Sequence, residues 1–162
     1  MTLDDENSPA YPNLGRFIRE AFKILRSGGR LILCTCSRYQ QAEGYWWASL
    51  IPNALEKVCR RFPPLEHIET TFLETGFEDI QCMVPLHAVL QGENYLDPEG
   101  PLKESWRAGD STWALASQEE LTQALDTVRD LLARGKMRDH LTTKENIRRR
   151  CGQATFLAAR KP

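Results

Sequence analysis

Two adjacent glycines, Gly28 and Gly29, stand between a helical pattern and an apolar run, and they constrain the fold of this 162-residue chain more than any other feature. The residues before them carry apolar side chains at helical spacing: Leu14, Phe17, Ile18, Ala21, Phe22 and Leu25. The run RLILCTC after them, residues 30–36, is apolar at successive positions, which predicts a strand covered on both faces, as in a parallel sheet between helices. The glycines are therefore expected to end a helix with a positive φ and to turn tightly into a buried strand.

This order of elements argues against a phosphate-binding loop. In such a loop the glycines follow a strand and open a helix, so that the backbone N–H groups at the helix start meet the anion. Here the glycines end a helix and open a strand, which is the reverse order. We therefore do not expect Gly28 and Gly29 to bind a nucleotide.

The middle and the end of the chain show further helix and strand patterns. Pro52 is expected to divide one apolar segment into two helical pieces. A short helix is predicted over residues 63–77, closed by Gly76, and strands are predicted over residues 77–84 and 153–160. Helices and strands in this order indicate part of an α/β sheet.

The segment between the last two predicted strands begins without a clear helix or strand pattern. Glycines and prolines interrupt residues 86–109, which is typical of a functional lid or of a disordered segment. A capping box at residues 117–120 predicts a helix that ends at Gly135, and Thr142 is expected to begin another short helix. The basic residues 148–150 are interpreted as a cationic last turn that faces the helix dipole.

Three stretches, in this order, resemble class I S-adenosylmethionine-dependent methyltransferases. FIREAFKILRSGGRLILCT, residues 17–35, is similar to the segment that leads from the fourth crossover helix into the fifth strand, with Ser27 where a proline is usual. FLETGFEDIQCM, residues 72–83, resembles the Gly-Phe turn and the sixth strand. GQATFLAARK, residues 152–161, resembles the seventh strand, which in this family runs antiparallel between the fifth and the sixth.

The resemblance implies an α/β fold with a partial Rossmann-like methyltransferase sheet, made of the last three strands with the final strand antiparallel. Helices would flank the sheet, and a helical insertion at residues 86–151, a possible substrate lid, would precede the last strand. Residues 1–162 would form a single partial methyltransferase-like domain. The implied methyl acceptor is a small molecule.

The implied cofactor is S-adenosylmethionine, but the residues that hold it in the family have no counterpart in this sequence. The family places the cofactor on a glycine-rich loop after the first strand, and an acidic residue that ends the second strand holds the ribose. This sequence has no such loop, so no cofactor-binding residue is assigned. The chain alone is expected to bind the cofactor weakly and to have little or no activity.

Candidate substrate-binding residues follow the strand at residues 30–36, because ligands of open α/β sheets lie beyond the carboxyl ends of the strands. They are Ser37, Arg38, Tyr39, Trp46 and Trp47, together with His87 after the next strand. By resemblance this region would face the methyl acceptor. The alternatives are that the tryptophans only pack a helix against the sheet and that His87, a possible general base, is an ordinary surface residue.

The five cysteines, an odd number without a C-x-x-C pair, indicate reduced thiols in a cytoplasmic protein. No metal site is expected, although Cys34 and Cys36 could bind zinc together with Cys59 or Cys82. A nucleophilic Cys36 is another weak alternative. The amino terminus, residues 1–10, is expected to be an arm or a loop and has no secretory signal pattern.

Charge and hydropathy limit the partners. The chain has 21 basic and 22 acidic side chains, which gives no electrostatic footprint for nucleic acid or an anionic membrane, and no apolar run has the length of a membrane span. The expected partners are a small-molecule acceptor and, through an unpaired edge of residues 31–36, a second copy or a complementary cofactor-binding half. A non-catalytic interaction half-domain, a truncated gene product and a nicotinamide-dependent reductase stay open as alternatives.

Overall fold

The computed structural model describes residues 11–162, so the arm expected at residues 1–10 lies outside the described part. The described chain divides into two compact units. The first unit contains residues 11–33, 63–81 and 157–162, and the second contains residues 34–62 and 82–156.

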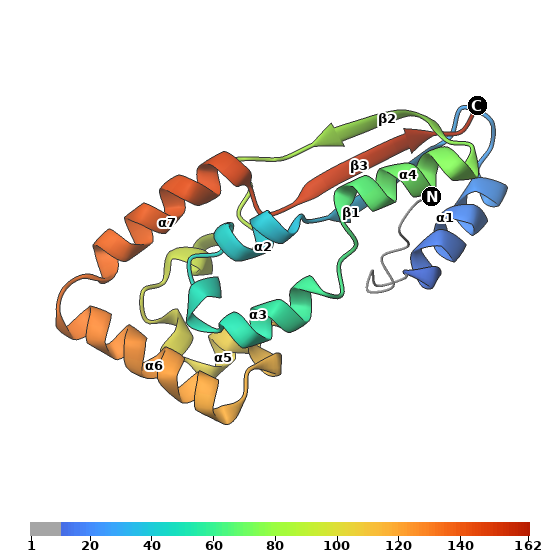
Figure 1. Ribbon diagram of the computed structural model, residues 1–162. Coiled ribbons are helices and arrows are strands. Elements are labelled where there is room, and N and C mark those ends of the chain that lie inside the picture. Colours follow the sequence, from blue (N-terminus) through green and yellow to red (C-terminus); the bar gives the residue numbers. More distant parts are fainter. Residues whose placement is uncertain (1–10) are drawn as a thin grey trace, which may run out of the picture. The chain divides into compact units, whose positions relative to one another are not determined.

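Three strands form one sheet in the order β1-β3-β2 (Figure 1). They are β1 (Arg30–Thr35), β2 (Glu78–Met83) and β3 (Thr155–Arg160). The N–H of Gly28 donates to the carbonyl of Lys161 at 2.9 Å, which places the end of β3 beside the start of β1. The last strand therefore lies between the other two and runs antiparallel to them, as the resemblance implies.

In the first unit, α1 (Pro12–Ile24) and α4 (Leu65–Thr75) pack on one face of the sheet. Their buried side chains share a cluster with residues of β3 and of the turn before β2: Ile18, Ile68, Phe72, Phe77, Leu157 and Ala159. Gly76 ends α4 with a φ of 100°, a left-handed conformation that favours glycine, as expected. The helical pattern before Gly28 and the turn after Gly76 are both confirmed. The expectation that the two glycines end the helix is wrong, because α1 already ends at Ile24 and its C-cap, Leu25, is extended.

The opposite face of the first unit's sheet is not covered by the described residues, so the expectation of a strand buried on both faces is wrong for this part of the chain. Burial alternates along β1, and Ile32 is 60% exposed. Ion pairs occupy part of the sheet's polar surface, where Arg30 contacts Asp79 at 2.6 Å and Arg160 contacts Glu78. β1 is an edge strand in the order β1-β3-β2, so the apolar run does not need helices on both sides.

The second unit begins with α2 (Arg38–Glu43) and α3 (Pro52–Cys59), joined through the 3-10 helix η1 (Ala48–Leu50). Pro52 stands in the first turn of α3 and divides the segment as predicted, because proline needs no hydrogen-bond acceptor for a backbone N–H there. An aromatic core lies beside these helices. Its large buried members are Trp46, Trp47, Tyr95 and Trp113.

Residues 86–109, predicted as a lid or as disordered, form the 3-10 helices η2 (Gly92–Leu96) and η3 (Gly100–Leu102) and the short helix α5 (Glu104–Arg107), so they are ordered, and a lid role stays a prediction. The 3-10 helix η4 (Trp113–Leu115) follows them. Tyr95 and Pro101 of the first two 3-10 helices and Trp113 of η4 are buried. The sequence pattern fades here because such short helical turns have no long hydrophobic period.

Two long helices follow, α6 (Gln118–Ala133) and α7 (Met137–Cys151), joined by a turn in which Gly135 has a φ of 65°. α6 starts and ends as predicted, but the helix expected to begin at Thr142 begins at Met137. The Thr142 hydroxyl donates to the carbonyl of Arg138 at 2.9 Å, so it is satisfied inside the helix rather than at its start.

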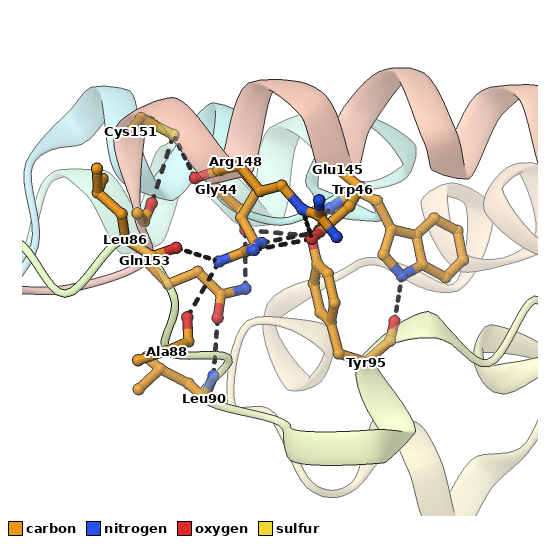
Figure 2. Close-up of polar contacts among 12 residues, drawn as sticks. Gly44, Trp46, Leu86, Ala88, Leu90, Tyr95, Glu145, Arg148, Cys151 and Gln153 are labelled. Carbon is orange, nitrogen blue, oxygen red and sulfur yellow. Dashed lines mark hydrogen bonds and ion pairs between the residues drawn. The ribbon is translucent and has the colours of Figure 1, made fainter.

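Residues 148–150 form the basic last turn of α7 that the sequence indicates, and Arg148 is in addition buried and binds the chain that leaves β2 (Figure 2). Its guanidinium donates to the carbonyls of Leu86 and Ala88 at 2.9 and 3.1 Å and pairs with Glu145 at 2.8 Å. Arg148 thereby lowers the pKa of the Glu145 carboxyl. Arg149 and Arg150 stay exposed.

Gln153 continues this polar cluster (Figure 2). Its side-chain oxygen accepts from the N–H of Leu90 at 2.8 Å, and its side-chain nitrogen donates to the carbonyl of Gly44 at 2.8 Å. The Tyr95 hydroxyl also contacts the Gly44 carbonyl, at 3.3 Å. These bonds attach the insertion to the segment after α2 within the second unit.

Candidate functional site

A cavity of about 280 Å³ lies in the second unit, just beyond the carboxyl end of β1. Three parts of the chain line it. The segment after β1 contributes Cys36, Gln41, Tyr45 and Trp47; α3 and the residues after it contribute Leu55, Val58 and Phe62; and the insertion contributes Gly109, Asp110, Ser111 and Thr112. This is the end of the strand where open α/β sheets bind ligands.

Ser37 and Gln40 fix the start of α2. They thereby position the neighbouring residues Cys36 and Gln41, which line the cavity. The Ser37 hydroxyl accepts from the N–H of Gln40 at 3.1 Å, and the Gln40 side-chain oxygen accepts from the N–H of Ser37 at 2.8 Å, a complete capping box. The Gln40 side chain also accepts from the Thr155 hydroxyl and donates to the Ala154 carbonyl. The strand-to-helix turn that carries Cys36 is therefore held in place.

Aromatic rings form one wall of the cavity. The centroids of Tyr45 and Trp47 are 5.2 Å apart, and Trp47 lies 5.6 Å from Trp113. The Trp47 indole N–H donates to the side-chain oxygen of Gln91 at 2.9 Å, which fixes the ring. Burial raises the pKa of the Tyr45 hydroxyl far above neutrality, so it stays protonated.

The polar side chains that line the cavity include Gln41, Cys36 and Asp110. The Gln41 side-chain nitrogen donates to the Cys36 sulfur at 3.2 Å, whereas its buried oxygen has no hydrogen-bond partner among residues 11–162. Burial raises the pKa of the Cys36 thiol, which does not favour the thiolate that a nucleophile needs. Asp110 accepts from the N–H of Thr112 at 2.8 Å.

Of the candidate substrate-binding residues, Trp47 lines this cavity, as does Cys36, the weak candidate nucleophile. Trp46 is fully buried in the core, where its indole N–H donates to the Tyr95 carbonyl. Arg38 pairs with Glu56 on the surface.

Three candidates remain outside the cavity. Ser37 belongs to the helix cap described above, Tyr39 is exposed, and His87 is exposed in the turn after β2. Their proposed roles in binding or catalysis stay predictions. Sequence reasoning missed the polar cavity residues Gln41 and Asp110. Gln41 lies in α2, shortly after Cys36, and could have been considered with it. Nothing in the sequence connects Asp110 with either residue.

A larger hollow of about 450 Å³ lies elsewhere in the second unit, beside α6 and α7. Its walls include Leu96, Leu132, Met137 and Leu141 and are mainly apolar. Its carboxylate, Glu145, is already bound by two arginines. It lacks the converging polar groups that orient a substrate, so it is the weaker candidate.

Within residues 11–162 no group of three or more His, Cys, Asp or Glu side chains could hold a metal, and all five cysteines are free thiols. None of the helices described within residues 11–162 is long and apolar enough to span a membrane.

Comparison with known proteins supports the fold. No family model and no curated protein matches the chain. Among solved structures, it is similar to a crystal structure from Anabaena variabilis described as "Putative methyltransferase from antibiotic biosynthesis pathway", with 22% identity and a TM-score of 0.68. The match covers 90% of this chain and 60% of that chain. The chain therefore has the mixed α/β fold of part of a methyltransferase-like structure.

Proposed function

We propose that this chain is the acceptor-binding part of a class I, S-adenosylmethionine-dependent methyltransferase that acts on a small molecule. The observation that carries the proposal is the aromatic-walled cavity at the carboxyl end of β1, in a chain whose fold matches part of a methyltransferase-like structure. The sheet order β1-β3-β2 with an antiparallel last strand supports the Rossmann-like assignment. Free thiols and balanced charge fit a cytoplasmic protein without a nucleic-acid or membrane partner.

The residues of the cavity would bind and orient the acceptor. Tyr45 and Trp47 offer flat apolar faces, Phe62 adds a third ring, and Gln41 offers a buried hydrogen-bond acceptor. Fixing the acceptor in one orientation and excluding water are the contributions that matter most for a methyl transfer, which is a displacement at carbon. Because no cofactor-binding residue is assigned in this sequence, we derive no transfer step and expect little activity from the chain alone.

Calorimetric titration with S-adenosylhomocysteine tests the cofactor part of this proposal. The chain is expected to show no binding in the micromolar range, and micromolar binding would contradict the absence of a cofactor site.

The acceptor part is tested by ligand-detected NMR with a library of small aromatic compounds. Compounds that bind should be excluded by Leu55→Trp, which fills the cavity, and not by Leu141→Trp, which fills the larger hollow. Circular dichroism confirms that both variants are folded. Binders that Leu55→Trp leaves unaffected would show that the cavity is not the site.

The exposed edge of β1 favours a second candidate function, a non-catalytic module that pairs with another strand. β1 is at the edge of the sheet, Ile32 is exposed, and the chain spans 60% of the similar structure. An unpaired edge of apolar residues is a template for another strand. We propose that this partner is a complementary part of a methyltransferase sheet. In the purified protein, where that part is missing, a second copy of the chain would pair with β1 instead.

A further inference from the structure

We propose that the cavity beyond β1 binds a small aromatic amine in its cationic form, with the ammonium group between the Asp110 carboxylate and the Gln41 side-chain oxygen. This inference rests on the proposed function in one respect, namely that the bound amine is the methyl acceptor. The cavity recognises the ammonium group of this ligand. Since a protonated nitrogen has no lone pair, the atom that accepts the methyl group would lie elsewhere on the ligand.

The charge of the cavity favours a cation. Asp110 is the one acidic side chain among the residues that line it, and those residues include no lysine or arginine. One oxygen of Asp110 accepts from the N–H of Thr112 at 2.8 Å, which leaves the other oxygen available to a ligand. A hydrogen bond between an ammonium and a carboxylate is stronger than one between neutral groups.

Gln41 provides the second, independent indication of a ligand. Gln41 lines the cavity and is only 4% exposed. Its side-chain oxygen nevertheless has no hydrogen-bond partner among the described residues. A buried acceptor without a donor is costly, and native proteins contain few of them. A ligand N–H that reaches this oxygen would supply the missing donor.

The aromatic walls suit the same ligand. Tyr45, Trp47 and Phe62 present rings that can stack on an aromatic group and attract a cation through their π-electrons. Burial keeps the Tyr45 hydroxyl and the Cys36 thiol neutral at pH 7, since it raises the pKa of both. Asp110 is therefore the negative charge that the ammonium meets.

Calorimetry with three probes of one skeleton tests the inference on the full chain: tyramine (cationic), 4-(2-hydroxyethyl)phenol (neutral) and 4-hydroxyphenylacetate (anionic). We expect tyramine to bind about tenfold or more tightly than the neutral probe, and the anion not to bind, because the carboxylate attracts only the cation. Equal affinity for the three probes, or no binding of tyramine, would overturn the inference.

Two matched substitutions locate the effect. Asp110→Asn keeps the shape and the acceptor for the Thr112 N–H but removes the charge, so tyramine should lose its advantage of about tenfold over the neutral probe. Asp126→Asn removes an exposed carboxylate of α6 outside the cavity and should change neither affinity. Unchanged tyramine binding in folded Asp110→Asn would contradict the inference.

The outcomes for the two proposals are distinct. If the neutral probe binds as well as tyramine and Leu55→Trp excludes both, the cavity is an acceptor site of another class and only the present inference fails. If S-adenosylhomocysteine binds tightly to the chain alone, the proposed function is wrong in its account of the cofactor, whereas the preference for a cation can still hold.

Discussion

At the scale of single residues, the capping box predicted at residues 117–120 forms only in part, because Glu120 has a different partner from the predicted one. The Ser117 hydroxyl caps α6 by accepting from the N–H of Glu120 at 3.1 Å, as the capping box predicts. The Glu120 carboxylate does not return to Ser117, however. It accepts from the backbone N–H groups of Asn53 and Ala54 at 2.6 and 3.3 Å and so caps α3. A negative charge at a helix start is favourable, so Glu120 connects two helices of the second unit.

Glu120→Ala should therefore lower the free energy of unfolding by about 1–3 kcal/mol, because it leaves the N–H groups of Asn53 and Ala54 at the start of α3 without this acceptor, and the second of them is buried. Glu120→Gln keeps an acceptor oxygen and should cost less than Glu120→Ala. Glu119→Ala, the exposed neighbour in the same turn, should change stability by less than about 0.5 kcal/mol. Urea unfolding followed by circular dichroism measures the stability of all three variants. Equal decreases in the free energy of unfolding for Glu119→Ala and Glu120→Ala would contradict the role of Glu120 as the cap of α3.

At the scale of elements, the two glycines between α1 and β1 have different roles. Gly28 has a φ of 75°, and a Cβ atom added there would meet no atom within 4 Å. Gly29 lacks a positive φ, but its Cβ would lie 2.8 Å from the carbonyl oxygen of Arg26. Gly28 is thus required for its backbone conformation and Gly29 for the space it leaves, and together they make the tight turn that the sequence predicts.

Substitutions should separate these two roles. Gly28→Asn should cost less than Gly28→Ala, which is expected to cost about 1 kcal/mol, because asparagine adopts left-handed conformations more readily than alanine. At Gly29 the two substitutions should both be destabilising, with asparagine no better than alanine, since any Cβ meets the Arg26 carbonyl. Thermal and urea unfolding check this ranking, and an asparagine at position 29 that is better tolerated than alanine would contradict it.

At the scale of the whole molecule, the sheet decides what the chain can associate with. β1 is an edge strand, and the alternation of burial along it leaves Ile32 60% exposed. Natural proteins protect such edges with charges or by covering them. The described residues leave the apolar edge of β1 available to another strand.

Ile32→Glu should therefore weaken self-association, because a charge on an edge strand opposes strand pairing. Size-exclusion chromatography with light scattering is expected to show a dimer or larger species for the unmodified chain and a monomer for Ile32→Glu. Phe17→Glu, which removes a comparably exposed apolar side chain from α1, is the control and should leave association unchanged. A soluble monomer of the unmodified chain would count against pairing through β1.

Much of the fold could be predicted from the sequence, and less of the candidate site. α1, α4 and α6 were expected close to their observed bounds, and the order of strands followed from a resemblance. The start of α7 and the packed insertion were missed, because short 3-10 turns and a polar first half of a helix carry little hydrophobic period. Of the cavity residues, Trp47 was a candidate for substrate binding and Cys36 a weak candidate nucleophile.

The sequence alone determined the elements whose cause lies within a few residues: the apolar stripe of α1, the turn at Gly28 and the left-handed end of α4 at Gly76. The tertiary structure alone decided where the polar side chains go. Asp110 and Gln41 share one cavity, and Arg148 binds the chain that leaves β2, although these partners are far apart in sequence. Backbone conformation depends on near neighbours, whereas a buried polar group is satisfied by whichever part of the chain folding places beside it.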